Sequence, residues 1–407
     1  MGYILGDSKP TPRIWRSTTI KRSTDRILTT FSGSLARPED LLTLMEAKEA
    51  GQPYDSAAYE ARVKSAVGES VRMQADSGVD IICDGEQGKA SFFGYVGERL
   101  TGFEVGDGPS MSQSRGTREN RDFPEFYAWY ATKREPSIAA SFVMSCTGPI
   151  AYQGQAALQD QLDTLKAALP GVKAEEVFVP SISPTNIEGP RSNTYYKSDE
   201  DYIFAIADAM HEEYQAIVDA GFLLQVDDPR MITHYITRPD DSLADVRKWV
   251  EMRVAAVNHA LRGIPADKVR FHTCYSINMG PRTHDMALKD IIDLLFTINA
   301  EGISYEAGNP RHDHEWQVFK DVKLPSDKVL IPGVISHTTT LVEHPELIAQ
   351  RLTQYADVVG RENVIAGSDC GFSSQATHEP EIHPTVVVAK LKAMAEGAAL
   401  ASRHLWG

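Results

Sequence analysis

Residues 200–229 read EDYIFAIADAMHEEYQAIVDAGFLLQVDDP and contain, in order, an amphipathic helix, a glycine and a mostly apolar strand. Gly221 stands where a left-handed residue ends a helix, and the strand after it ends in two aspartates. The same order of helix, glycine and strand recurs at 56–86 around Gly78, at 285–308 around Gly302 and at 345–371 around Gly360. Strands that alternate with helices predict βα units and a parallel sheet.

Eight apolar runs predict strands at 27–31, 79–86, 139–147, 222–227, 268–274, 302–307, 329–335 and 363–369. Eight βα units favour an α/β fold of the (β/α)8 TIM-barrel type. A ninth apolar run, 177–184, falls in the Pro- and Ser-rich stretch 150–200, which we interpret as an insertion after the third strand. A doubly wound open sheet also fits the pattern, although no GxGxxG motif follows an early strand. We expect an N-terminal extension at 1–26 and a single catalytic barrel at 27–407.

The amino-acid composition excludes several classes of protein. With 42% hydrophobic and 24% charged residues, the chain of 407 residues is neither fibrous nor wholly disordered. A net charge of −15 argues against a nucleic-acid partner, because phosphate contacts need clustered Lys and Arg. No apolar run approaches the ~20 residues that span a bilayer, and no secretory signal is evident. Four cysteines do not make a disulfide scaffold, so we expect a cytoplasmic protein with free thiols. A homo-oligomer is compatible with the sequence, which leaves the oligomeric state open.

Polar residues recur at the carboxyl ends of the predicted strands. They are Ser32, Gly33 and Ser34, Asp84 and Glu86, Thr147, Asp227 and Asp228, His272 and Cys274, Glu306, His337, and Asp369 and Cys370. In a (β/α)8 barrel this is the face that carries the active site. Each residue alone could be a solvated strand end, but their regularity favours one shared site.

Three of these positions suggest a metal. His272 and Cys274 lie two residues apart, so on a strand both side chains face one side. Thiolate and imidazole ligands suit Zn²⁺, and Cys370 and Glu306 end two further strands. An HxC pair alone more often marks two buried strand residues, and we interpret Cys83 and Cys146 as such small hydrophobes.

Several motifs resemble, in the same order, the C-terminal catalytic barrel of cobalamin-independent methionine synthase. They are TTFSGS (29–34), GEQGK (85–89), CTGP (146–149), LLQVDDP (223–229), HTCYS (272–276) and GSDCGF (367–372). Further, 94–105 resembles the segment after that family's GEFER motif. The resemblance extends from about residue 27 to 375, with gaps in two long loops.

The resemblance implies a zinc ion bound by His272, Cys274, Glu306 and Cys370. The zinc would activate a small, homocysteine-like thiol for attack on an alkyl donor, with both reactants as small-molecule partners. Ser32, Gly33, Ser34, Glu86 and Asp227 match positions that bind the amino-acid thiol in that family. His337 falls near the family's proton-donating histidine, and the alternative for it is an ordinary loop histidine.

The donor half of the family's site is not matched. Gln155 falls near a Trp that stacks on folate in the family, and Arg115 aligns poorly with a folate-contacting Arg. Tyr152, Tyr195 and Tyr196 are other candidate donor contacts or packing residues. We therefore expect a zinc-dependent S-methyl- or S-alkyltransferase. The alternatives are an epoxyalkane:coenzyme M transferase-like enzyme, a metal-free uroporphyrinogen decarboxylase-like enzyme and a non-catalytic zinc-stabilised barrel.

Overall fold

The computed structural model describes residues 19–92, 94–105, 116–133, 137–139, 144–189, 191–276 and 279–407. Most of the predicted N-terminal extension, residues 1–18, lies outside the described residues, as does Arg115. No helix within the described ranges is both long and apolar enough to cross a membrane.

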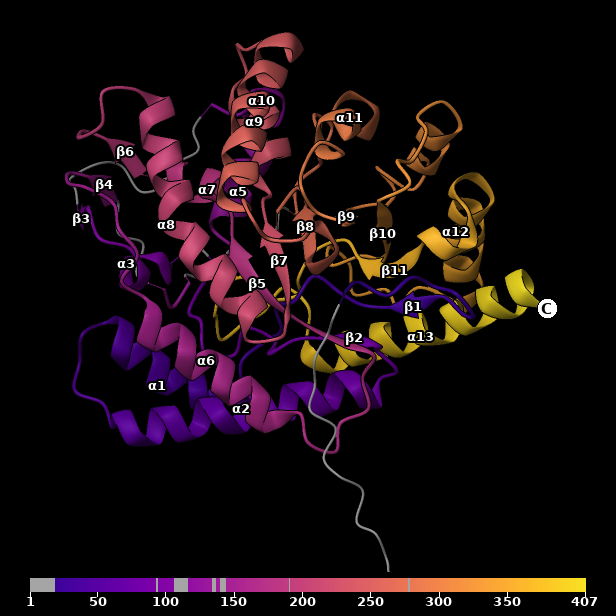
Figure 1. The fold of residues 1–407 in the computed structure, drawn as a ribbon, viewed down its shortest axis with the longest axis horizontal. Helices are drawn as coiled ribbons and strands as arrows, with labels where there is room; N and C mark the ends of the chain where they lie inside the picture. Colours follow the sequence, from indigo (N-terminus) through magenta and orange to yellow (C-terminus); the bar gives the residue numbers. More distant parts are fainter. Residues whose placement is uncertain are drawn as a thin grey trace, which may run out of the picture.

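Eight parallel strands form a nearly closed barrel, which confirms the predicted (β/α)8 fold (Figure 1). Around the barrel the strands are β1 (Leu28–Thr29), β11 (Ile365–Ser368), β10 (Val329–Ile335), β9 (Gly302–Tyr305), β8 (Val269–Thr273), β7 (Leu223–Asp227), β5 (Glu176–Ile182) and β2 (Ile81–Ile82). At the seam between β1 and β2 the Asp80 amide donates to the Thr29 carbonyl at 3.1 Å, and Thr30 Oγ1 donates to the Ile81 carbonyl at 3.0 Å.

The third barrel strand is not the one that the sequence predicted. It is β5, which lies in the run that we placed within an insertion at 150–200. The described end of the predicted strand 139–147 contains instead β4 (Met144–Cys146), which pairs with β3 (Phe103–Val105) and β6 (Arg191–Asn193) in a separate sheet. Figure 1 shows this three-stranded sheet beside the barrel, at the left. Most of the added chain therefore lies between the second and third barrel strands, because β5 pairs with β2 and β7.

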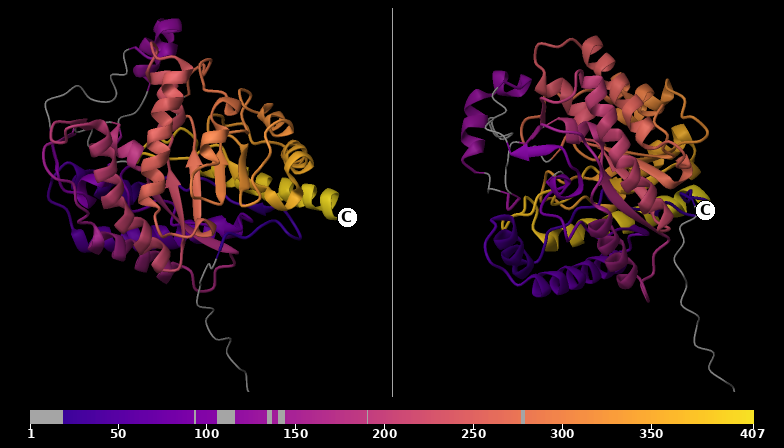
Figure 2. Two further views of the ribbon diagram at one scale, coloured as in Figure 1. Left: turned by 45° about the horizontal axis from the view of Figure 1, so that its top comes forward. Right: turned by 60° about the vertical axis from the view of Figure 1, so that its left-hand side comes forward.

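Helices surround the barrel (Figures 1 and 2). Thirteen α-helices are described: α1 (Glu39–Glu49), α2 (Ser56–Asp76), α3 (Val96–Arg99), α4 (Arg118–Asp122), α5 (Pro124–Ala131), α6 (Gln155–Ala168), α7 (Pro184–Glu188), α8 (Asp199–Asp219), α9 (Arg230–Thr237), α10 (Leu243–Ala260), α11 (Ile292–Leu295), α12 (Pro345–Val359) and α13 (Pro384–Trp406). Short 3₁₀ turns add η1 (Ala266–Lys268), η2 (Leu288–Asp290), η3 (Glu315–Lys320) and η4 (Arg361–Asn363).

Capping residues mark the ends of α2 and α8. Asp55 caps α2 by accepting from the Ala58 amide at 3.0 Å, which satisfies a free amide of the first turn. Gly78 and Gly221 adopt φ values of 83° and 90° after α2 and α8, as a left-handed helix end requires. The predicted helix at 285–301 is wrong, since only η2 and α11 form there. The Leu288 amide donates to the Glu315 side chain at 2.7 Å, so this amide does not form a helical hydrogen bond.

The barrel interior holds a buried arginine below the predicted site. Arg270 on β8 is 1% exposed, donates to Thr30 Oγ1 at 2.9 Å and lies over the Phe178 ring at 4.1 Å. Apolar strand residues pack with the helices in one hydrophobic core. The packed interior leaves the carboxyl-terminal mouth as the face where side chains can meet a ligand.

Candidate active site

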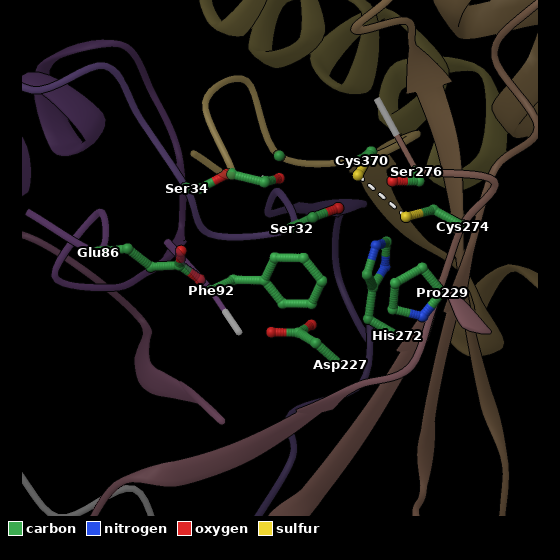
Figure 3. Close-up of a pocket in the computed structure, with 12 residues that line it drawn as sticks. Ser32, Ser34, Glu86, Phe92, Asp227, Pro229, His272, Cys274, Ser276 and Cys370 are labelled. Carbon is green, nitrogen blue, oxygen red and sulfur yellow. Dashed lines mark hydrogen bonds between the residues drawn. The ribbon is translucent and has the colours of Figure 1, made fainter. Parts of the chain in front are cut away.

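Strand register brings residues from distant parts of the chain to one level of the barrel. Asp227 pairs with His272, and His272 pairs with Ser304 on the next strand. The strands end there, so Cys274, two residues further along, lies at the mouth. A cleft opens at this point, lined by Ser32, Ser34, Glu86, Phe92, Asp227, Pro229, His272, Cys274, Ser276, Cys370, Gly371 and Ser374 (Figure 3).

Three predicted metal ligands gather at one side of this cleft. The ligand atoms of His272, Cys274 and Cys370 lie within 4.8 Å of one another, and all three residues are buried. The two thiols are free, and their sulfur atoms are 3.0 Å apart. Burial, followed by the neighbouring Cys370, raises the pKa of the Cys274 thiol. A cation at this point would favour the thiolate forms and offset the repulsion between them.

The imidazole of His272 is oriented toward this group. Its Nδ1 lies 3.0 Å from Ser304 Oγ, whereas its buried Nε2 has no hydrogen-bond partner among the described residues. Burial lowers the pKa of His272 to about 3, so the ring is neutral and Nε2 can offer a lone pair. A buried nitrogen without a partner beside two thiols fits a zinc ion, because the ligand types and the hydrogen bond at the other nitrogen are those of zinc sites.

Glu306, the fourth predicted ligand, lies in a neighbouring group. Its carboxylate is within 4.8 Å of ligand atoms of His337 and Asp369, all of them buried. Glu306 Oε2 is 2.7 Å from Arg282, and Oε1 accepts the Tyr275 amide at 2.6 Å. Burial raises the pKa of Glu306 to about 7, although Arg282 lowers it. The carboxylate is therefore adjacent to the three ligands but bound to protein donors.

His337 reaches the same neighbouring group from the end of β10. Its Nε2 lies 3.1 Å from the Ser276 carbonyl, so this nitrogen carries the hydrogen of the neutral ring. Its Nδ1 is buried, and within the described part of the chain it has no hydrogen-bond partner. Burial lowers the pKa of His337 to about 4, while Asp369 raises it.

Glu86 and Asp227 supply the carboxylates of the cleft. Burial, then the neighbouring Glu86, raises the pKa of Asp227 well above its usual value, and burial also raises that of Glu86. Asp227 Oδ1 accepts from Gln225 at 2.9 Å, but Glu86 Oε2 is buried with no partner in the described ranges. Two buried carboxylates that face one cleft are suited to a cationic group such as an ammonium.

The Ser32–Ser34 turn forms another wall of the cleft. Gly33 has a φ of 126°, a conformation that side chains disfavour. Ser32 donates through its amide to Ser368 Oγ at 3.1 Å, and Ser34 Oγ lies 3.4 Å from Ser374 Oγ. Figure 3 shows Ser32 and Ser34 beside the loop that carries Cys370.

Loop residues that sequence reasoning missed complete the site. Phe92, Ser276 and Ser374 line the cleft from loops whose irregular backbone carries no periodic signal. Arg37 is 5% exposed and donates to the carbonyls of Leu35, Lys89 and Ser373. It thereby joins the loops after β1, β2 and β11. The only sequence signal for this role was an arginine three residues after the SGS motif.

The candidate donor residues are mostly structural. Tyr152 donates to buried Glu213 at 2.9 Å, and Tyr196 accepts the Ile150 amide at 2.9 Å. Gln155 begins α6 and donates to Glu212 at 3.1 Å. Only Tyr195, which is 51% exposed, presents a ring to solvent among these four.

The fold and the site together define a (β/α)8-barrel enzyme with a buried group of nitrogen and sulfur ligands at its mouth. The family of cobalamin-independent synthase catalytic domains matches residues 27–130 and 190–399. The chain belongs to this family and is an enzyme of the methyltransferase type.

Three similar proteins illustrate the relationship. Methionine synthase from Thermococcus kodakarensis is 24% identical over 383 residues, which are 93% of this chain and 94% of that protein. Methionine synthase from Sulfurisphaera tokodaii is 27% identical over 356 residues, or 84% and 85% of the two chains. The structure of a B12-independent methionine synthase from Shewanella sp. W3-18-1, in complex with selenomethionine, covers 93% of this chain and 99% of its own with a TM-score of 0.69 at 19% identity. This last likeness concerns the fold alone.

Proposed function

We propose that the protein is a zinc-dependent S-methyl- or S-alkyltransferase that acts on a small, homocysteine-like thiol, as in methionine formation. The observation that carries the proposal is the buried group of His272, Cys274 and Cys370 at the mouth of a barrel of this family. Family membership favours this function over a decarboxylase. A cleft beside the group favours catalysis over a closed structural zinc site.

His272 Nε2 and the sulfur atoms of Cys274 and Cys370 would hold the zinc. When bound, zinc supplies strong acidification of a coordinated thiol, which gives a thiolate nucleophile at neutral pH. Ser304 fixes the orientation of His272, and the burial of all three residues excludes bulk water. Glu306 remains the fourth ligand that the family resemblance implies.

Asp227 and Glu86 would bind the α-ammonium group of the thiol substrate. Their carboxylates have a buried, partly unsatisfied environment that a cation relieves. The Ser32–Ser34 turn lies beside them and would receive the carboxylate end of the same amino acid. These contacts orient the sulfur toward the ligand group and leave the open side of the cleft to the donor.

His337 would donate a proton to the leaving group of the alkyl donor. Its Nε2 is committed to the Ser276 carbonyl, so Nδ1 is the atom that can hold and release a proton. A neutral ring at physiological pH can take up this proton before the transfer, with Asp369 and Glu306 beside it to stabilise the charge.

Metal analysis of the purified chain tests the proposal. We expect about one zinc per chain, in accord with a single tetrahedral site. Cys370→Ser should lose stoichiometric zinc, whereas Cys146→Ser, a buried thiol in the separate sheet, should retain it. Thiol-dependent methyl transfer by zinc-free protein would contradict the proposal. Ring opening of a simple epoxide by the thiol would instead favour the epoxide-transferase alternative.

A further inference from the structure

A buried ion pair connects the C-terminal helix α13 to the loop that carries His337. The side chains of Lys390 on α13 and of Glu343 in the loop are 0% and 8% exposed. Lys390 Nζ lies 2.9 Å from Glu343 Oε2 and 3.1 Å from Oε1, and it also donates to the Leu341 carbonyl. A buried pair has to satisfy its hydrogen bonds to offset the loss of hydration, so both side chains hold fixed positions.

The ion pair reaches His337 through the backbone. Glu343 Oε1 accepts the Ser336 amide at 2.8 Å, and Ser336 directly precedes His337 in the chain. The Thr338 amide, on the other side of His337, donates to Ser336 Oγ at 3.2 Å. Ser336 and His337 are 1% and 3% exposed. The backbone on both sides of His337 is therefore fixed by hydrogen bonds that end at Lys390.

The placement of His337 decides what its ring can reach. His337 Nε2 lies 3.1 Å from the carbonyl of Ser276, a residue that lines the cleft. A general acid has to come within about 2.6–3.2 Å of the atom that it protonates. A shift of the Ser336 backbone would therefore take the proton out of reach without changing the ring itself.

We propose that Glu343 and Lys390 are positioning residues that place His337 for proton donation to the leaving group of the alkyl donor. This inference rests on the proton transfer in the proposed function. In that step the bond between the methyl carbon and the leaving atom breaks, the thiolate sulfur bonds to the methyl carbon, and His337 Nδ1 gives its proton to the leaving atom. Neither Glu343 nor Lys390 lines the described cleft, so their effect on the reaction passes through the loop.

The ratio of two transfer rates tests the inference. Methyltetrahydrofolate releases a nitrogen that needs a proton, whereas methylcobalamin releases cobalt as Co(I), which keeps the electron pair and takes no proton. Glu343→Ala should lower kcat with methyltetrahydrofolate on the order of 10²-fold, the lower end of what a general acid contributes. With methylcobalamin kcat should change less than about threefold, as should KM for homocysteine with either donor. Lys390→Met should lower the ratio of the two rates in the same direction.

Three further variants separate positioning from general damage. Glu343→Gln keeps an oxygen that accepts the Ser336 amide, so the ratio should return to within about threefold of the wild type. Glu346→Ala removes an exposed carboxylate from the first turn of α12 and should change neither rate. In the His337→Asn background, Glu343→Ala should cause no further loss with methyltetrahydrofolate, because residues that act as a unit are not additive.

Several outcomes would overturn the inference. Equal losses with both donors in Glu343→Ala would show that the ion pair is only structural, and an undiminished effect of Glu343→Ala in the His337→Asn background would show that it does not act through His337. Should Glu343→Ala fail to fold, Glu343→Asp, whose carboxylate is one methylene further from Ser336, takes its place, and an unchanged ratio there overturns the inference.

The behaviour of the wild type separates this inference from the proposed function. A wild type that uses methylcobalamin alone has no leaving group to protonate, which overturns the inference and leaves the methyl transfer intact. If methyltetrahydrofolate is the only donor used, the cycle with His337→Asn decides. If the wild type forms no methionine from either donor, the proposed function itself fails.

Discussion

Three non-glycine residues with left-handed backbone surround the site. Glu86, Ser276 and Arg282 have φ values of 56°, 65° and 56°, and they are the only such residues in the described part of the chain. Each such conformation costs on the order of 1–3 kcal/mol in a side-chain-bearing residue. Glycine would relieve this cost, so the side chains at these positions have a use. Glu86 carries a cleft carboxylate, Arg282 pairs with Glu306, and Ser276 lines the cleft.

Asp227 provides a prediction for substrate binding. Asp227→Asn should raise KM for homocysteine roughly tenfold or more, because a hydrogen bond to a charged group contributes about 1.5–3 kcal/mol. Zinc content should stay at the wild-type value. The measurement is steady-state kinetics with metal analysis, and the control is Asp208→Asn, an exposed carboxylate beside His259. Loss of zinc, or a preference for thiols without an amino group, would refute the role of Asp227.

His312 provides a prediction for the pH dependence of stability. Burial lowers the pKa of His312, but hydrogen bonds to Asp285 and Glu315 outweigh it and raise the pKa to about 9. A histidine whose pKa is raised by folding stabilises the protein fully below its unfolded pKa of about 6.5, and this stability is lost as the pH rises through about 9. The loss is at most about 3 kcal/mol.

Urea unfolding at pH 6.5 and pH 9 measures this effect. The free energy of unfolding should fall more steeply with pH in the wild type than in His312→Gln, whose side chain does not titrate. Equal pH dependence in the two proteins would show that His312 is not held as an imidazolium.

At the level of elements, the strand ends were predictable and the loops were not. Apolar strands that end in polar residues mark the mouth of the barrel, and the structure places Asp227, His272, Cys274 and Cys370 there. The third strand was misplaced because β5 contains Pro180 and Ser181, which are unusual inside a central strand. Arg282 escaped prediction because its approach to Glu306 depends on a loop path that has no period.

A buried polar network joins three elements around β5. Glu213 on α8 lies 3.1 Å from Arg99 on α3, and it accepts from Tyr95, Tyr152 and Ser181. Arg99→Met should lower the free energy of unfolding by about 3–5 kcal/mol, because a buried charge loses its partner. Urea unfolding measures it, with Arg121→Gln, which breaks an exposed pair with Asp240, as the control. Equal losses of unfolding free energy in Arg99→Met and Arg121→Gln would show that the buried network contributes no more than an exposed ion pair.

At the scale of the whole molecule, the proposed thiol and its donor would meet at the mouth of this one barrel. The match to the Thermococcus methionine synthase covers 93% of this chain and 94% of that protein. The ligand group and the two carboxylates line one cleft at the barrel mouth (Figure 3), so the donor would approach them through this mouth. We therefore expect the loops over the mouth to decide which donor is accepted.

The last prediction concerns that donor. The resemblance to the family implies that Gln155 stands near the position of a folate-stacking Trp, and its side chain donates to Glu212. A flat pteridine gains about 1–3 kcal/mol from stacking on an aromatic face, by analogy with nucleic-acid bases. We therefore expect methyltetrahydrofolate polyglutamate to support transfer to homocysteine at least about tenfold less well than methylcobalamin, since 1.4 kcal/mol is a factor of ten. Methionine formation with each donor at equal concentration measures the ratio. Efficient turnover with the folate would contradict the prediction. In that case Phe92 would be the candidate stacking surface, since it is the one Phe, Tyr or Trp that lines the described cleft, and Phe92→Ala should lose the turnover.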